Sequence, residues 1–314
     1  MRQVPSTIGP PPAARRARSA PPLALACAAL LAALFGGPAA AAIKLRFLTA
    51  VYVDGAGKPL ATPEGVACNG SRLVVADSSG GRLVTFTVDG ETVTPAGEIV
   101  LPQLPSPIRT RLDSKGNLLV LDGKLRRIAR VSASGAFTAY VDAAPGGAFV
   151  PRSFALDRAD TLYILDIAGG RVVVLDAQDK VVKEIALPSG RGSFSDIAVD
   201  GKGTVYALDS VGRRVLVARK DQAAFAPLGA DLAADADFPT SLAVDEAGHL
   251  FASDQDGGTI LVLGPDGAVQ SRQSGPGWKA AFLRAPSQLC LDGRGRLIVA
   301  DRDNKRVQIF TMIP

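Results

Sequence analysis

The chain has 314 residues, of which 47% are hydrophobic and 21% are charged, so it is long enough to bury a large core. It carries 35 Lys and Arg residues against 30 Asp and Glu residues, but four of the arginines lie within the first 18 positions. The remainder, with 31 basic and 30 acidic residues, is nearly neutral. Overall charge therefore gives no argument for a nucleic-acid partner, and we expect none.

The first 42 residues differ in composition from the rest of the chain. Arginines and prolines come first, without any acidic residue, and an apolar segment follows from Leu23 to Phe35. Small residues then lead to Ala42. This order predicts a secretory signal peptide over residues 1–42, and hence a periplasmic or secreted protein. The apolar segment is shorter than the about 20 residues of a membrane-spanning helix. We therefore expect cleavage and no remaining membrane span, with a retained anchor as the alternative.

From residue 43 onward, one short pattern recurs six times. Each copy contains a short strand ending mostly in Asp, a turn that usually has Gly, an apolar second strand, a third strand and a more variable fourth strand. A strand with continuous apolar character is typically buried on both faces. The second strand ends in an Asp that recurs every 43–47 residues, at Asp77, Asp122, Asp166, Asp209, Asp254 and Asp301. Four-stranded sheets repeated at this period predict an all-β propeller with six antiparallel blades.

The two ends of this region indicate that the propeller closes. The sixth repeat reaches Phe310 with four residues left, so it lacks a fourth strand. Conversely, Lys44 to Val53 has the composition of a strand but belongs to no repeat. Placing this N-terminal strand at the outer edge of the last blade completes the ring. We therefore predict one six-bladed propeller domain over residues 43–314.

The repeat pattern P-x-x-Φ-x-Φ-D…G-x-L-Φ-V-x-D…R-V-x-Φ-F resembles that of the NHL-repeat family of six-bladed propellers. The resemblance covers residues 63–310, and the sixth copy matches best, through Asp301, Asn304 and Arg306. The first two copies depart most, through Asn69 and Thr110. The family includes exported bacterial proteins, interaction modules, RNA-binding modules and a few lyases, so the resemblance implies the fold but no single function.

Five of the recurring aspartates are followed five residues later by an arginine. A carboxylate and a guanidinium that flank one turn can pair and also satisfy turn amides. Because the arrangement repeats in blade after blade, we interpret it as structural rather than catalytic. Thr259 replaces the arginine after Asp254, which leaves that carboxylate free for another partner. The predicted clamps are Asp77–Arg82, Asp122–Arg127, Asp166–Arg171, Asp209–Arg214 and Asp301–Arg306.

Three arginines and the one tryptophan are the candidate binding residues. Arg111 occupies a position that is small in the other five repeats, and Arg109 faces the same side of its strand. Together with Arg152 they predict a positive site at the channel mouth for an anion or carboxylate. The alternative is that a buried arginine pairs with a carboxylate of a neighbouring blade. Trp278 lies in a long loop between repeats, where it is either a binding anchor or packs its own loop down.

Two cysteines and one histidine remain in the predicted mature chain. Cys68 and Cys290 lie in the first and last repeats, which a closed ring makes neighbours. Export would permit a disulfide. Alignment of the repeats, however, places the two on opposite faces of equivalent strands, so we expect two buried free thiols. His249 is expected to be a solvent-exposed turn residue, and one histidine is too few for a zinc site built from several.

These observations favour a binding protein over an enzyme. The first hypothesis is a monomeric, non-catalytic scaffold without a cofactor, which binds a protein, peptide or cell-surface glycan through Arg109, Arg111, Arg152 and Trp278. The alternative is a hydrolase or lyase resembling gluconolactonase or strictosidine-synthase propellers. Such an enzyme would need a metal such as calcium, held in the channel by Glu64, Asp196 and Gln288.

Overall fold

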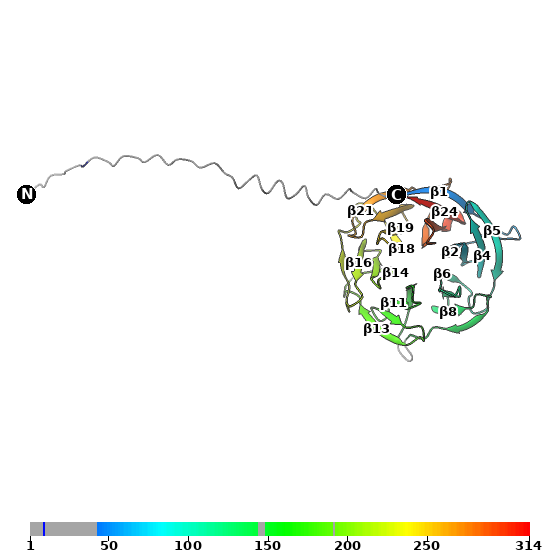
Figure 1. The fold of residues 1–314 in the computed structure, drawn as a ribbon, viewed down its shortest axis with the longest axis horizontal. Helices are drawn as coiled ribbons and strands as arrows, with labels where there is room; N and C mark the ends of the chain where they lie inside the picture. The colour runs from blue at the N-terminus through cyan, green and yellow to red at the C-terminus, as the bar shows by residue number, and fades with distance from the viewer. Residues whose placement is uncertain (1–8, 10–42, 144–147, 191) are drawn as a thin grey trace, which may run out of the picture. The chain divides into compact units, whose positions relative to one another are not determined.

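A computed structural model describes residue 9 and residues 43–143, 148–190 and 192–314. The predicted signal peptide therefore lies outside the described residues, apart from residue 9. Residues 42–314 form one compact unit. It is a closed ring of six sheets around a central channel (Figure 1). None of the described residues forms a helix long and apolar enough to cross a membrane.

Each of the six sheets has four antiparallel strands, as predicted. From the channel outwards, the blades are β2 (Pro63–Asn69), β3 (Arg72–Asp77), β4 (Arg82–Asp89) and β5 (Thr92–Ile99); β6 (Pro107–Leu112), β7 (Leu118–Asp122), β8 (Arg127–Val131) and β9 (Phe137–Tyr140); β10 (Pro151–Leu156), β11 (Leu162–Asp166), β12 (Arg171–Leu175) and β13 (Val181–Ala186); β14 (Phe194–Val199), β15 (Val205–Asp209), β16 (Arg214–Ala218) and β17 (Ala226–Leu228); β18 (Pro239–Val244), β19 (Leu250–Asp254), β20 (Thr259–Leu263) and β21 (Val269–Ser274); and β22 (Pro286–Leu291), β23 (Arg296–Asp301), β24 (Arg306–Ile313) and β1 (Lys44–Val51). A 3₁₀ turn, η1 (Arg302–Asn304), joins β23 to β24.

The N-terminal strand closes the ring, which confirms the predicted topology. β1 pairs antiparallel with β24, with Phe47 opposite Phe310 and Val51 opposite Val307. The rings of Phe47 and Phe310 meet edge to face, with their centroids 6.1 Å apart. The last blade thus takes its outer strand from the start of the domain and its other three from the end.

The hydrophobic core lies between blades rather than within one layer. All five residues of β7, β11, β15 and β19 are buried, because both faces of each sheet pack on a neighbouring blade. Val66 and Val75 of the first blade, for example, share a core cluster with Ile298 and Val307 of the last. Continuous apolar strands are therefore buried on both faces, as expected from the sequence.

The first strand of every blade carries a β-bulge near its start. In β6, Pro107 pairs with Asp122 and the next paired residue is Arg109, opposite Leu121. The same shift follows the first residue of β2, β10, β14, β18 and β22. A bulge bends its strand and re-aims the next side chains. Here the side chain that follows the bulge reaches across the channel, as described below.

The alternating strand directions give the propeller two distinct faces. The connections between second and third strands, and those from one blade to the next, emerge where the first strands begin. We call this side the loop face. The hairpin turns between first and second strands and between third and fourth strands lie on the opposite side, which we call the turn face. Each first strand therefore runs from the loop face to the turn face.

Candidate functional site

Exposed apolar side chains concentrate on the loop face. The described residues include eleven large hydrophobic side chains that are exposed. Three of them, Val181, Val182 and Ile313, belong to strands β13 and β24. The other eight lie in connections of the loop face, and they are Tyr52, Val53, Val100, Leu125, Ile167, Val211, Trp278 and Phe282. Exposed apolar side chains of the described residues are thus more numerous on the loop face than elsewhere on the propeller.

Trp278 is the most exposed of these side chains, at 72% of its full area. Its loop, between β21 and β22, is held in place by other residues. Arg306 donates hydrogen bonds of 2.8 Å to the carbonyl oxygens of Lys279 and Phe282. The Asn304 amide donates to the carbonyl of Gly277, also at 2.8 Å. The indole ring is thus displayed on a fixed loop rather than used to pack that loop down.

The three candidate arginines are spread along the depth of the channel rather than gathered at one mouth. Arg152, at the start of β10, is exposed on the loop face. It borders a depression of about 400 Å³ with Ile167 and Phe194. Arg109 lies two residues into β6, and Arg111 two residues further. Because a strand advances about 3.3 Å per residue, Arg111 lies near the turn face, on the side opposite Arg152 and Trp278.

Arg109 contacts groups across the channel, whereas the alternative interpretation expected a carboxylate of a neighbouring blade. Its guanidinium donates hydrogen bonds to the carbonyl oxygens of Thr240, at 3.3 Å, and Ser287, at 3.4 Å. It also lies 3.9 Å from the Asp196 carboxylate. That carboxylate is fully buried and accepts hydrogen bonds from the hydroxyls of Ser153 and Ser241 and from the amide of Leu242. Arg109 thus joins the second blade to the fourth, fifth and sixth.

The Gln288 side chain completes this set of cross-channel contacts. Its Oε1 accepts hydrogen bonds from the amides of Val66, at 3.2 Å, and Thr110, at 3.3 Å. Its Nε2 donates to the Thr110 carbonyl at 3.2 Å. Hydrogen bonds of buried side chains now link the first strands of all six blades. We call the residues that make them the channel belt, namely Arg109, Ser153, Asp196, Ser241 and Gln288.

The channel belt occupies one position of the repeat. Its members each lie two residues after the start of a first strand, just past the bulge. The equivalent residue of the first blade is Gly65, where a Cβ atom would lie 2.9 Å from both Gln288 Oε1 and the Ile108 carbonyl. The sequence signal was therefore present, because this position is small or polar in every repeat. Ser153 and Ser241 were not predicted from the sequence, because the residues compared between repeats were those two positions later, such as Ala67 and Arg111.

The recurring aspartates hold each blade to the loop that precedes it. Four predicted clamps form ion pairs, with guanidinium–carboxylate distances of 2.9, 3.3, 3.1 and 2.6 Å for Asp77–Arg82, Asp166–Arg171, Asp209–Arg214 and Asp301–Arg306.

The fifth predicted clamp does not form. Arg127 does not pair with Asp122 among the described contacts and instead stacks on the Tyr140 ring, 3.8 Å from its centroid. Asp122 accepts the amides of Ser106 and Leu125. Asp254 similarly accepts those of Asp237 and Phe238, so its carboxylate is used structurally.

The expectation of two free thiols is wrong, because Cys68 and Cys290 form a disulfide. Their Cα atoms lie 6.0 Å apart, on β2 and β22. Alignment correctly placed the two residues on opposite faces of equivalent strands, but the conclusion drawn from it was reversed. Neighbouring blades of a ring pack through opposite faces, so side chains on opposite faces meet at the interface between the first and last blades.

Comparisons with known proteins agree with this architecture. The NHL repeat family matches residues 283–310, which form most of the last blade. NHL repeat-containing protein 3 of mouse is 36% identical over 77 residues, which cover 24% of this chain and 22% of that protein. The chain is a six-bladed β-propeller whose last blade is an NHL repeat. The aligned part spans only about a fifth of the mouse relative, so the match carries no activity with it.

Two solved structures show how widely the fold of this propeller is used. Virginiamycin B lyase from Staphylococcus aureus superposes with a TM-score of 0.60 at 13% identity, covering 86% of this chain and 100% of the lyase. An auxiliary nutrient binding protein from Bacteroides thetaiotaomicron superposes with a TM-score of 0.64 at 12% identity, covering 86% and 76%. At these identities the similarity shows the fold alone.

His249 of the propeller lies in the turn that leads to β19, on the turn face. Its side chain is only 19% exposed, so the expectation of a solvent-exposed residue is wrong. The ring Nδ1 lies 2.9 Å from the Asp245 carboxylate, whose other oxygen accepts the His249 amide. This contact within one turn explains the burial and gives the imidazole a local structural role.

The residues suggested for a metal do not form a ligand set in this propeller. The oxygens of Asp196 and Gln288 accept the hydrogen bonds of the channel belt, and Glu64 lies 3.7 Å from the Arg302 guanidinium. Within the described residues, no three His, Cys, Asp or Glu side chains are placed to hold one metal ion. A calcium ion needs six to eight oxygen ligands, which these side chains could supply only by giving up existing contacts.

We therefore predict no stoichiometric uptake of calcium. Isothermal titration of the metal-free protein with calcium chloride should give only the heat of dilution. Removing the belt carboxylate by Asp196→Asn should leave that result unchanged. Saturable uptake of one calcium ion per chain that disappears in Asp196→Asn would contradict the prediction and favour the enzyme alternative.

Proposed function

We propose that this protein is an exported, non-catalytic binding scaffold whose loop face holds a protein, peptide or cell-surface glycan. The observation that carries the proposal is the concentration of exposed apolar side chains on that face, with Trp278 displayed on a fixed loop. Tryptophan, tyrosine and arginine are the residues most enriched among those that dominate binding energy. Trp278, Tyr52 and Arg152 supply one of each.

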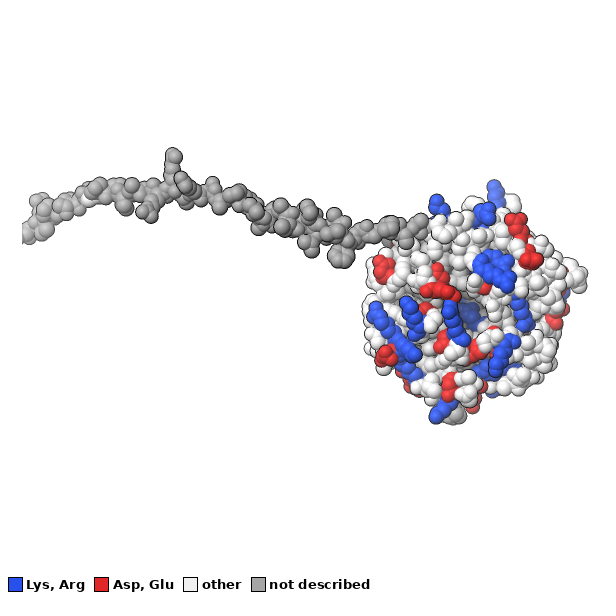
Figure 2. All heavy atoms as spheres, in the orientation of Figure 1, with Lys and Arg blue, Asp and Glu red and all other residues white. Residues whose placement is uncertain are grey.

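Two further observations support export and binding. The Cys68–Cys290 disulfide suits an oxidising compartment outside the cytoplasm, which agrees with the predicted signal peptide. Figure 2 shows acidic and basic side chains interspersed on one face of the propeller, around a central hollow. A mixed surface of this kind does not favour nucleic acid, which needs a concentrated basic patch. We expect the scaffold to act as a monomer.

Arg152 gives the loop face a polar contact beside apolar ones. The depression that it borders is also lined by Leu187 and Pro188, so it offers a cation next to an apolar wall. A partner group with an acidic end and an apolar body fits both features. This region would therefore recognise an acidic side chain of a protein or peptide, or an acidic sugar of a glycan.

Replacing Trp278 and Phe282 together by alanine should abolish partner capture. A tryptophan at the centre of an interface can contribute 2 kcal/mol or more, so we expect affinity to fall by about thirtyfold or more. The measurement is a pull-down from envelope extract with the protein lacking residues 1–42, followed by titration of the captured partner. Val181→Ala combined with Val182→Ala is the matched control, because it removes exposed apolar groups from an outer strand. Equal capture by both variants would overturn the proposal.

A further inference from the structure

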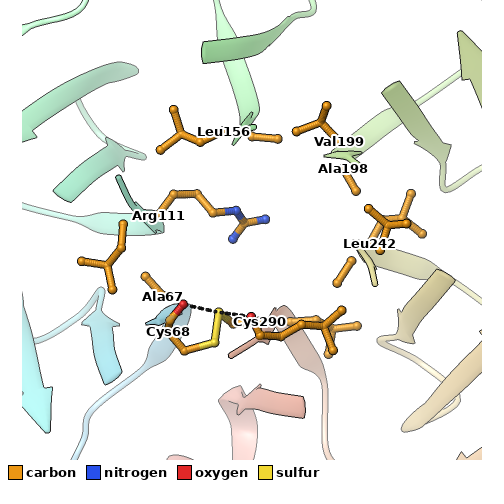
Figure 3. A pocket seen from close by; sticks show the side chains of 14 residues that line it. Ala67, Cys68, Arg111, Leu156, Ala198, Val199, Leu242 and Cys290 are labelled. Carbon is orange, nitrogen blue, oxygen red and sulfur yellow. Dashed lines mark hydrogen bonds between the residues drawn. A yellow bond between two sulfur atoms is a disulfide. The ribbon is translucent and has the colours of Figure 1, made fainter. Parts of the chain in front are cut away.

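The turn-face end of the channel contains a cavity that the proposed function does not use. It measures about 190 Å³ and is lined by the first strands of all six blades. Arg111 is the one charged residue among the fourteen that line it, and its guanidinium points into the middle of the ring (Figure 3). On each strand, the channel belt lies one to three residues closer to the loop face. The belt therefore lies on the loop-face side of the cavity, and none of its five residues lines the cavity.

The Arg111 guanidinium is poorly paired within the described part of the chain. Its Nη1 donates one hydrogen bond, of 3.2 Å, to the carbonyl of Thr110, and no ion pair is formed. Burial lowers the pKa of this group; Asp196 opposes that effect and Arg109 adds to it. The side chain nevertheless stays charged at neutral pH, because the arginine guanidinium is not deprotonated in proteins. Most of its five N–H donors are thus left facing the cavity.

The acidic residues near this end of the channel are already engaged. The Asp113 carboxylate accepts the amides of Lys115 and Asn117 in its own turn. The Asp292 carboxylate likewise pairs with Arg296, and Asp196 belongs to the channel belt. Asp157, Asp200 and Asp245 likewise accept amides of their own turns. No described carboxylate forms an ion pair with Arg111, so a counter-ion would come from outside the protein. Such an ion would remove the cost of a partly buried, unpaired charge.

The walls of the cavity offer further polar contacts. Each first strand is the terminal strand of its sheet, so one of its edges has no strand partner. Backbone N–H and C=O groups on such an edge remain available to a ligand, apart from those that the belt uses. The side chains beside them are apolar, including Leu156, Val199 and Leu242. The cavity can therefore bind a charged group and a few polar atoms at the same time.

We propose that this cavity binds a small monocarboxylate, with its two oxygens on the Arg111 guanidinium and its remaining polar atoms on the strand edges. Room for about six water molecules, at about 30 Å³ each, sets the size of the ligand. A hydroxy acid such as lactate meets this limit. Asp157, Asp200, Asp245 and Glu246 line a neighbouring depression on the turn face and disfavour a multiply charged anion. The site thus selects a carboxylate over phosphate or sulfate.

The test is calorimetric titration of the protein with sodium lactate at low ionic strength. We expect one site per chain, with affinity at least tenfold lower in Arg111→Met, because methionine removes the charge-assisted hydrogen bonds to the carboxylate. Arg272→Met is the matched control, since Arg272 is exposed on the outer strand β21, and it should bind as the wild type does. Binding that survives Arg111→Met, or no binding to the wild type, would overturn the proposal.

Two further arms identify the source of the carboxylate and guard against misfolding. A tripeptide with a free C-terminus is compared with its C-terminal amide; tighter, Arg111-dependent binding of the free form would assign the site to a peptide end. Phosphate that binds more tightly than lactate would refute selection of a carboxylate. A crystal structure of the wild-type protein grown with lactate tests the site without relying on the folding of any variant. Lactate on Arg111 supports the proposal, and an unoccupied cavity at saturating lactate refutes it.

Discussion

Replacing Asp196 by alanine is expected to destabilise the propeller more than any other single substitution in the channel. Its carboxylate is fully buried and accepts hydrogen bonds from Ser153, Ser241 and the Leu242 amide, while also facing Arg109. Alanine would leave these donors and a nearly buried guanidinium without their acceptor. Breaking a buried charge pair from one side costs about 3–5 kcal/mol. We expect the melting temperature to fall by about 10 °C.

The measurement is thermal and urea unfolding followed by circular dichroism. Asp89→Ala is the matched control, because Asp89 is exposed at the end of β4, and it should change the free energy of unfolding by less than about 0.5 kcal/mol. Arg109→Met tests the same contact from the other side and should be milder, since Asp196 retains its other donors. If Asp196→Ala unfolds like the control, the channel belt does not hold the blades together.

The blades and their closure could be predicted because they follow from patterns along the chain. A strand buried on both faces reads as an uninterrupted apolar run, such as Leu118–Asp122, wherever it occurs. Closure followed from a missing strand at one end and a surplus strand, Lys44–Val51, at the other. Both arguments need only the order of elements, so they do not depend on how side chains meet in space.

The site was harder to predict because it depends on contacts between blades. The channel belt is visible only when one position is compared around the whole ring; within a single repeat, Ser153 or Gln288 looks like ordinary variation. Arg111 was predicted to lie at the same channel mouth as Arg109 and Arg152. Two residues along a strand, however, move a side chain by more than about 6 Å, here towards the other end of the channel. The exposure of Trp278 depends on Asn304 of η1 and Arg306 of β24, which hold its loop through hydrogen bonds.

Reducing the Cys68–Cys290 disulfide should lower stability by about 3–5 kcal/mol. The two cysteines are 222 residues apart, so the bond closes a loop that includes most of the domain. In the chain-entropy description, the stabilisation grows with the logarithm of loop length and reaches about 5 kcal/mol for a loop of this size. We expect reductant to lower the melting temperature of the wild type by about 5–10 °C. Scanning calorimetry with and without reductant measures the shift.

The control for that experiment is the double variant Cys68→Ala, Cys290→Ala. It should melt at the temperature of the reduced wild type, and reductant should not change its melting temperature. The physical reason lies in where the ring is joined. The first and last blades are covalently linked at the inner strands β2 and β22, while β1 joins β24 towards the outside of the last blade. The hydrogen bonds between β1 and β24 can break one after another from the strand end. The disulfide between β2 and β22, by contrast, keeps the first and last blades in contact. A reduced wild type that melts like the oxidised one would show that β1 alone secures the closure.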